Sequence, residues 1–255
     1  MTQNLPRHMN AENTRRDFII RATSVGVALC SSPAVGNAQY SKRMFSYIGQ
    51  SGVPSASGMF LGVLYSADDT THRAEIQKIR EKCSYWRKLL SRSTDKWKIK
   101  YSHQIIDYIL SQDSIRYFCA RIENAIWPDD PAEKDAVRLS CYAALISQSG
   151  MLRSALPVSV SLKYTEKNPH DRRLARGLQD FVSRENDQNR VIKADNELIE
   201  ISQFLTGLAR YEFAVMRSAR RAEINRYLRE KLSVRTLSVD ELSQNAKFRM
   251  QTIRV

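Results

Sequence analysis

Two apolar segments of strand length, joined by a short loop, constrain the fold of this chain most strongly. Residues 44–52 (MFSYIGQSG) form a short alternating pattern that ends in a Gln-Ser-Gly turn, and residues 59–65 (MFLGVLY) are a continuous apolar run. The intervening VPSAS consists of turn-forming residues. Two strands joined in this way predict a β-hairpin.

The rest of the chain alternates helical and strand periodicities. Helices are expected over 103–112, 131–150, 169–185, 195–216 and 219–232, after a first helix that is capped by Ser66 or Asp68 and includes Leu90. The aromatic side chains on that first helix are expected to pack in the core. Strands are expected at 95–101, 114–122, 157–164, 190–194 and in the tail that ends at Val255. This alternation predicts one α/β domain, residues 39–255, with a mixed sheet.

The chain is strongly basic. It has 40 Lys and Arg against 27 Asp and Glu, a formal charge of +13. Such a charge favours a polyanionic partner, nucleic acid included, or an anionic membrane surface. A basic protein without such a partner is the alternative.

A lysine-rich segment is the clearest candidate for polyanion contact. In DKWKIKY (95–101), Lys96, Lys98 and Lys100 alternate with aromatic and apolar residues, which predicts a strand with one basic face. A row of lysines suits phosphate binding, and edge strands also use lysine to prevent aggregation. Both interpretations stay open at this point.

The amino terminus resembles a twin-arginine export signal. Thr14, Arg15, Arg16, Asp17 and Phe18 precede a mildly apolar run that ends in small residues. Cleavage after position 38 would remove four basic and two acidic side chains, which lowers the charge from +13 to +11. The apolar run is too short for a stable membrane span of about 30 Å. We expect a periplasmic or exported protein; the alternatives are a retained N-terminal helix in a cytoplasmic protein, or an upstream start that is not translated.

Cysteines and histidines give no sign of a metal or redox site. The cysteines lie at positions 30, 83, 119 and 141, and the histidines at 8, 72, 103 and 170, without ligand spacing. We expect the cysteines to be small buried residues.

The order of these segments resembles a widespread bacterial family of RNase H-like domains whose opening strand ends in Asp-Glu-Ser-Gly. The resemblance covers residues 45–248. It rests on Gly49, Gln50, Ser51 and Gly52 in the opening strand, on the WKIKY segment, and on the late helix LIEISQFLTG (198–207). The resemblance implies an RNase H-like mixed sheet flanked by helices. It also implies that, in active members of such a fold, catalytic carboxylates hold divalent metal ions.

The acids of that pattern are missing here. Gly49 and Gln50 stand where the family has Asp and Glu, and Gln203 stands where the late helix has Asp. Because Mg²⁺ prefers anionic oxygen ligands, these replacements predict weak metal affinity and no cofactor. Asp195, Asn196 and Glu200 are the candidates that could rescue a site, with Glu200 and Gln203 one helical turn apart.

Two functions follow as hypotheses. The first is a catalytically degenerate RNase H-like domain, not an enzyme, that binds nucleic acid or another polyanion. The second is an active metal-dependent nuclease or phosphotransferase that uses Mg²⁺ or Mn²⁺ with a non-standard acidic set. A fold that serves only as a scaffold is a third possibility.

Overall fold

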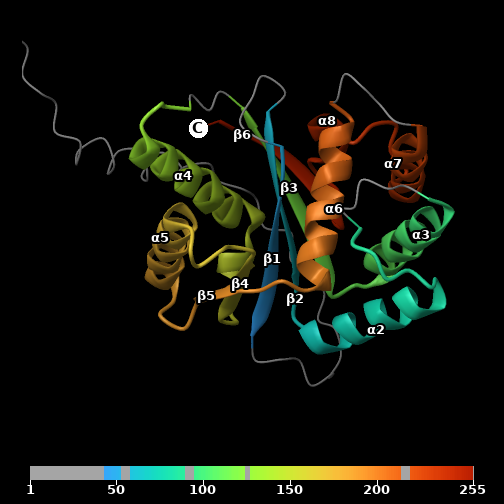
Figure 1. The fold of residues 1–255 in the computed structure, drawn as a ribbon, viewed down its shortest axis with the longest axis horizontal. Coiled ribbons are helices and arrows are strands. Elements are labelled where there is room, and N and C mark those ends of the chain that lie inside the picture. Colours follow the sequence, from blue (N-terminus) through green and yellow to red (C-terminus); the bar gives the residue numbers. More distant parts are fainter. Residues whose placement is uncertain (1–42, 53–57, 90–94, 124–126, 214–218, 255) are drawn as a thin grey trace, which may run out of the picture. The chain divides into compact units, whose positions relative to one another are not determined.

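A computed structural model describes residues 43–52, 58–89, 95–123, 127–213 and 219–254. These residues form a six-stranded sheet in the order β5-β4-β1-β2-β3-β6, with helices on both faces (Figure 1). The segment 1–38, in which the sequence predicts an export signal, lies outside the described residues. None of the helices in the described part of the chain combines the length and apolar character needed to span a bilayer.

The sheet is mixed, and its centre is the predicted hairpin. β1 (Met44–Ser51) pairs antiparallel with β2 (Met59–Ser66), which pairs antiparallel with β3 (Ile115–Glu123). β4 (Val158–Leu162) is parallel to β1, β5 (Arg190–Lys193) is parallel to β4, and β6 (Phe248–Arg254) is parallel to β3. The α/β fold class with a mixed sheet flanked by helices is therefore confirmed, and the strand order is consistent with the expected RNase H-like sheet.

Each face of the sheet has its own apolar core. On one face, Tyr47, Phe60 and Tyr117 pack with residues from α2 (Asp69–Lys82), α3 (Lys96–Ser111), α6 (Glu197–Tyr211), α7 (Ala219–Leu232) and α8 (Val239–Leu242). On the other, Ile48 and Phe118 pack with α4 (Pro131–Ser149), α5 (Pro169–Glu185) and the short 3-10 turn η1 (Met151–Arg153). Successive strand residues point to opposite faces, which sends neighbouring side chains of β1 into different cores.

Most predicted elements lie where the periodicity indicates. Helices α5 and α7 have the predicted bounds, and α4 stops at Gly150, whose φ of 80° is a left-handed C-cap. Helix α6 begins after Asn196, whose side chain accepts a hydrogen bond from the Ile199 backbone N–H at 3.1 Å. The predicted end of that helix at position 216 falls outside the described residues. The turn η1 and helix α8 were not predicted.

The predicted strand over 95–101 is wrong, because these residues begin helix α3. Asp95 caps the helix by accepting a hydrogen bond from the Lys98 backbone N–H at 2.8 Å. The apolar spacing continues through Ile105 and Ile109, a helical period that outweighs the short alternation. Lys98 is consequently buried, and it does not share an exposed row with Lys96 and Lys100.

Helix α2 is shorter than predicted and ends at Lys82. Cys83 follows as the C-cap, and Ser84 takes a left-handed backbone conformation with a φ of 51°. Trp86, expected in the core, is instead 63% exposed, while Tyr85 and Leu89 are buried. Leu90 lies outside the described residues.

Helices α2 and α7 end in the same hydrogen-bonded turn, each with a serine in place of the usual glycine. Ser84 N–H donates to the Glu81 carbonyl and Tyr85 N–H to the Arg80 carbonyl, at 2.9 and 3.0 Å. Ser233, with a φ of 56°, occupies the equivalent position after α7. This is the Schellman arrangement, in which a residue with a Cβ is strained by about 1 kcal/mol.

We expect Ser84→Gly and Ser233→Gly each to raise the free energy of unfolding by about 0.5–1 kcal/mol, because glycine adopts this conformation without a steric penalty. Urea unfolding followed by circular dichroism measures the effect. Ser147→Gly inside α4 is the matched control and should destabilise, since glycine is unfavourable within a helix. Destabilisation by both turn substitutions would contradict the assignment.

A buried histidine ties α2 to α3 and to the turn before β3. His72 Nδ1 lies 2.7 Å from the Tyr108 hydroxyl and Nε2 lies 2.9 Å from Ser114 Oγ. Burial lowers the pKa of His72, although Asp68 and Asp69 act in the opposite direction. The folded protein therefore binds fewer protons at this site than the unfolded chain.

The stability that this difference supplies is complete above the unfolded-state pKa of about 6.5 and is lost as the pH falls towards the lower folded-state value. We therefore expect the urea concentration at the unfolding midpoint to decrease when the pH is lowered from 7.5 to 5.5. His72→Gln should weaken that dependence, with the remainder arising partly from His103, whose pKa burial also lowers. An unchanged pH dependence in the variant would exclude this role for His72.

Candidate functional site

A pair of glycines at the centre of the sheet allows helix α6 to approach very closely. Gly49 of β1 is the register partner of Gly62 of β2. A Cβ atom on Gly49 would lie 2.4 Å from the Gln203 backbone nitrogen, and one on Gly62 would lie 2.1 Å from the Tyr117 hydroxyl oxygen. Both distances are far inside van der Waals contact, so the two glycines are required for this packing.

Buried hydroxyl groups close the contact between α6 and the sheet. Ser202 Oγ donates to the Gly62 carbonyl at 3.3 Å, and Thr206 Oγ1 lies 2.7 Å from the Tyr117 hydroxyl. Ser202 and Thr206 have no exposed surface. The helix backbone and these hydroxyls thus fill the space above the middle of β1 and β2.

This packing gives a structural reason for glycine at position 49. The sequence indicates that Gly49 stands where the resembled family has an aspartate, so the change looks like a loss of charge alone. In the structure, the Cα–Cβ direction of Gly49 points into the backbone of α6 at Ser202 and Gln203. A carboxylate at this position would have to displace the helix.

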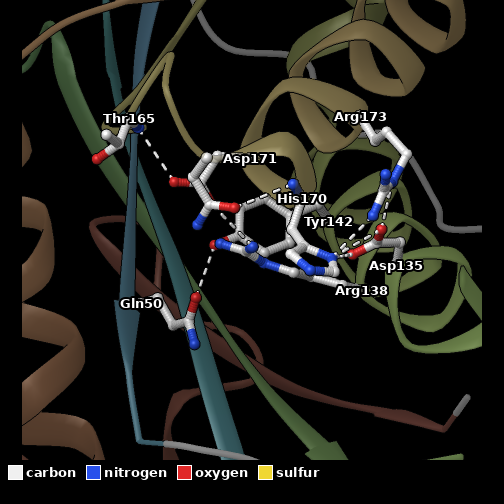
Figure 2. A network of polar contacts seen from close by, with 9 residues as sticks. Gln50, Asp135, Arg138, Tyr142, Thr165, His170, Asp171 and Arg173 are labelled. Carbon is white, nitrogen blue, oxygen red and sulfur yellow. Dashed lines mark hydrogen bonds and ion pairs between the residues drawn. The ribbon is translucent and has the colours of Figure 1, made fainter. Parts of the chain in front are cut away.

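The other positions of the opening strand divide between the two faces. Ser51 faces α6, with its Oγ 3.8 Å from where a Cβ of Gly207 would lie, and Gly52, with a φ of 87°, lies against the Arg210 side chain. Gln50 points to the opposite face, where its Oε1 accepts a hydrogen bond from the Tyr142 hydroxyl at 2.9 Å (Figure 2). Gln50 and Gln203 therefore do not converge.

Beside Gln50, polar contacts join α4 to α5 (Figure 2). Asp135 of α4 accepts from Arg173 Nε at 2.5 Å and lies 2.9 Å from His170 Nδ1. Arg138 pairs with Asp171 at 3.0 Å. The second oxygen of Asp171 accepts a hydrogen bond from the Thr165 backbone N–H at 3.0 Å, which holds the segment after β4.

This network contains the residue types of a catalytic site, but its side chains pair with one another between two helices. Burial tends to raise the pKa of Asp135, but hydrogen bonds from Arg173 and His170 outweigh it and lower that pKa. Within the described residues, the side-chain partners of His170 are Asp135 and Arg173, neither of which is a nucleophile. Because these contacts join side chains of α4 to side chains of α5, we assign the network to holding the two helices together.

Glu200 also holds the fold together. Its carboxylate accepts a hydrogen bond from the Leu89 backbone N–H and pairs with Arg80 Nη2 at 3.3 Å. The Arg80 and Glu200 side chains are only 11% and 14% exposed. Glu200 therefore attaches the segment after α2 to α6.

The remaining acidic candidate is also paired. Asp195 accepts a hydrogen bond from Lys163 Nζ at 2.7 Å, and this bond is the main cause of its lowered pKa. Asn196, next to it, is used as the cap of α6. Among the described residues, no three His, Cys, Asp or Glu side chains are grouped as a metal site would require.

The residues that the sequence analysis missed as functional candidates are two exposed tryptophans. Trp86 is 63% exposed after the end of α2, and Trp97 is 46% exposed in the first turn of α3. Lys96 Nζ lies 5.2 Å from the centre of the Trp97 ring. The basic residues beside each indole in the sequence were the available signal.

The sequence matches no protein-family model and no curated protein. The fold class is shown by the strand order and directions. Membership of the resembled family stays a prediction.

We expect Gly49→Ala to destabilise the protein by about 3 kcal/mol or more, because the added Cβ would overlap rigid helix backbone. Gly207→Ala is the matched control in the same interface, where the nearest atom to the added Cβ is 3.8 Å away. It should be neutral or more stable by up to about 1 kcal/mol, since alanine favours a helix. Urea unfolding compares them, and equal tolerance of both would refute the close packing.

Proposed function

We propose that this protein is an RNase H-like domain that binds a polyanion without hydrolysing it. The observation that carries the proposal is the close packing of Gly49 against α6. An ideal Cβ on Gly49 would lie 2.4 Å from the backbone nitrogen of Gln203, at the position where the opening strand would otherwise present a carboxylate. Two-metal hydrolysis needs carboxylates grouped around both ions. The backbone of α6 occupies the space that a side chain at position 49 would need.

The state of the remaining acids supports the same proposal. Glu200 is paired with Arg80 and the Leu89 backbone, and Asp195 is paired with Lys163. An active nuclease or phosphotransferase using Mg²⁺ or Mn²⁺ would have to break these pairs and move α6. The charge of +13 and the exposed Lys96 and Lys100 support an anionic ligand.

We expect no cleavage of labelled single-stranded or duplex DNA or RNA above a buffer control, in either Mg²⁺ or Mn²⁺. The protein should still bind these polyanions, with an affinity that falls as salt rises, because phosphate contacts release counterions. Gel analysis of the labelled strands measures cleavage, and fluorescence anisotropy measures binding at several salt concentrations.

The assay needs variants that separate activity from contamination. Asp195→Asn removes an exposed candidate ligand, and Asp187→Asn, at an exposed site on the loop after α5, is the matched control. Glu200 is left intact because its carboxylate holds Arg80 and Leu89. Metal-dependent cleavage that co-purifies with the protein and is lost only in Asp195→Asn would overturn the non-hydrolytic proposal. Absence of binding at low salt would favour a scaffold.

A further inference from the structure

Two neighbouring segments on the α2 and α3 side of the sheet each carry an exposed indole next to basic residues. We define the tryptophan–lysine patch as the exposed residues Trp86, Arg87, Lys88, Lys96, Trp97 and Lys100. Arg87 Nη1 lies 3.5 Å from Asp95 Oδ2, which brings the segment after α2 against the start of α3. Each indole is thus one or two residues from this contact.

The segment that carries Trp86 is held at both ends. The Tyr85 ring stacks on Tyr101 with centroids 5.0 Å apart, and its hydroxyl donates to the Lys88 carbonyl at 3.0 Å. Leu89 is buried, and its backbone N–H donates to Glu200. Because Tyr85 and Leu89 are anchored, the three residues between them are displayed to solvent by a fixed backbone.

The start of α3 presents the second indole in a similar way. Asp95 caps the helix, and Lys98 is buried beneath it, so Lys96 and Trp97 project from a rigid first turn. The Lys96 ammonium lies 5.2 Å from the centre of the Trp97 ring. A cation over one face of an indole leaves the opposite face for stacking and keeps a charge beside whatever stacks there.

We propose that this patch binds single-stranded nucleic acid, with bases stacked on Trp86 and Trp97 and phosphates paired with the surrounding lysines and arginine. The inference rests on the proposed function and names its ligand. Exposed aromatic rings next to positive charges are what sequence-tolerant single-strand recognition uses. A duplex hides the faces of its bases, so the indoles should contribute little to duplex binding.

An anionic membrane is a poorer match for the same surface. Interfacial binding needs a continuous apolar face that enters the headgroup region. Here Tyr85 and Leu89 point into the core, and the two indoles alternate with charged side chains. The described residues of the patch therefore offer stacking surfaces without a continuous apolar face.

Tryptophan fluorescence tests the proposal directly, because the chain has 3 tryptophans and the third, Trp127, packs against the other core. We expect oligothymidylate to quench the emission of the intact protein and to bind with micromolar or tighter affinity at low salt. Trp86→Ala and Trp97→Ala should each weaken binding about 5- to 100-fold, the range for loss of one stacked base. Trp127→Phe is the matched aromatic control and should leave the affinity unchanged.

Charge variants separate stacking from general attraction. Lys96→Ala with Lys100→Ala should reduce the slope of log affinity against log salt by about 0.7 for each lost phosphate contact. Arg172→Ala with Arg176→Ala removes the same charge from the exposed surface of α5 and should leave the slope unchanged. Circular dichroism verifies that every variant folds.

The outcomes distinguish this inference from the function on which it rests. If the tryptophan variants bind the oligonucleotide as tightly as the intact protein, the patch is not the binding site. The same holds if both pairs of charge variants weaken binding equally. Either result leaves a polyanion-binding domain. Binding of heparin without the oligonucleotide does the same. Binding of phosphatidylserine vesicles that depends on both indoles, without oligonucleotide binding, overturns the ligand assignment. Failure to bind any of these polyanions overturns both proposals.

Discussion

The close approach of helix α6 to the glycine pair of the central hairpin is the constraint on which the structure depends. Gly49 and Gly62 remove two side chains from adjacent strands at one level. The backbone at Ser202 and Gln203 fills the space beside Gly49, and the hydroxyls of Tyr117 and Thr206 fill the space beside Gly62. Ser202 and Thr206 then satisfy buried polar groups across the contact. The same packing defines one core of the protein and leaves no room for a side chain at position 49.

The acidic residues that could compensate have structural roles instead. Glu200 anchors the segment after α2, Asp171 holds the segment after β4, and Asp195 is paired with Lys163. Removing one partner of a buried charge pair is costly because the other charge is left without compensation. Glu200, whose pair with Arg80 is largely buried, therefore contributes to stability, whereas the exposed pair of Asp195 with Lys163 contributes little.

Much of the fold could be predicted from the sequence because its periodicities are strong. The apolar runs of the hairpin and the amphipathic pattern of α5 each have one consistent interpretation. The start of α3 does not, since the six alternating residues 96–101 resemble a strand until the Asp95 cap and the later isoleucines are considered. Trp86 was misplaced because nothing in a serine marks the left-handed turn that ends α2. The site was harder to predict: isolated glycines in paired strands signal close backbone approach, but which helix makes it depends on tertiary packing.

The glycine pair also restricts how this protein can change. A carboxylate introduced at position 49 would meet the helix backbone before it could meet a metal ion, so a single substitution harms folding without creating chemistry. Shifting α6 first would open a void over Gly49 and Gly62 and separate the buried hydroxyls of Ser202 and Thr206 from their partners. Each step is unfavourable alone, and only simultaneous changes in strand and helix would be tolerated. The close contact between strand and helix therefore opposes the addition of a ligand at this position. A designer who wanted to add hydrolysis to this scaffold would have to place the ligands elsewhere on the sheet.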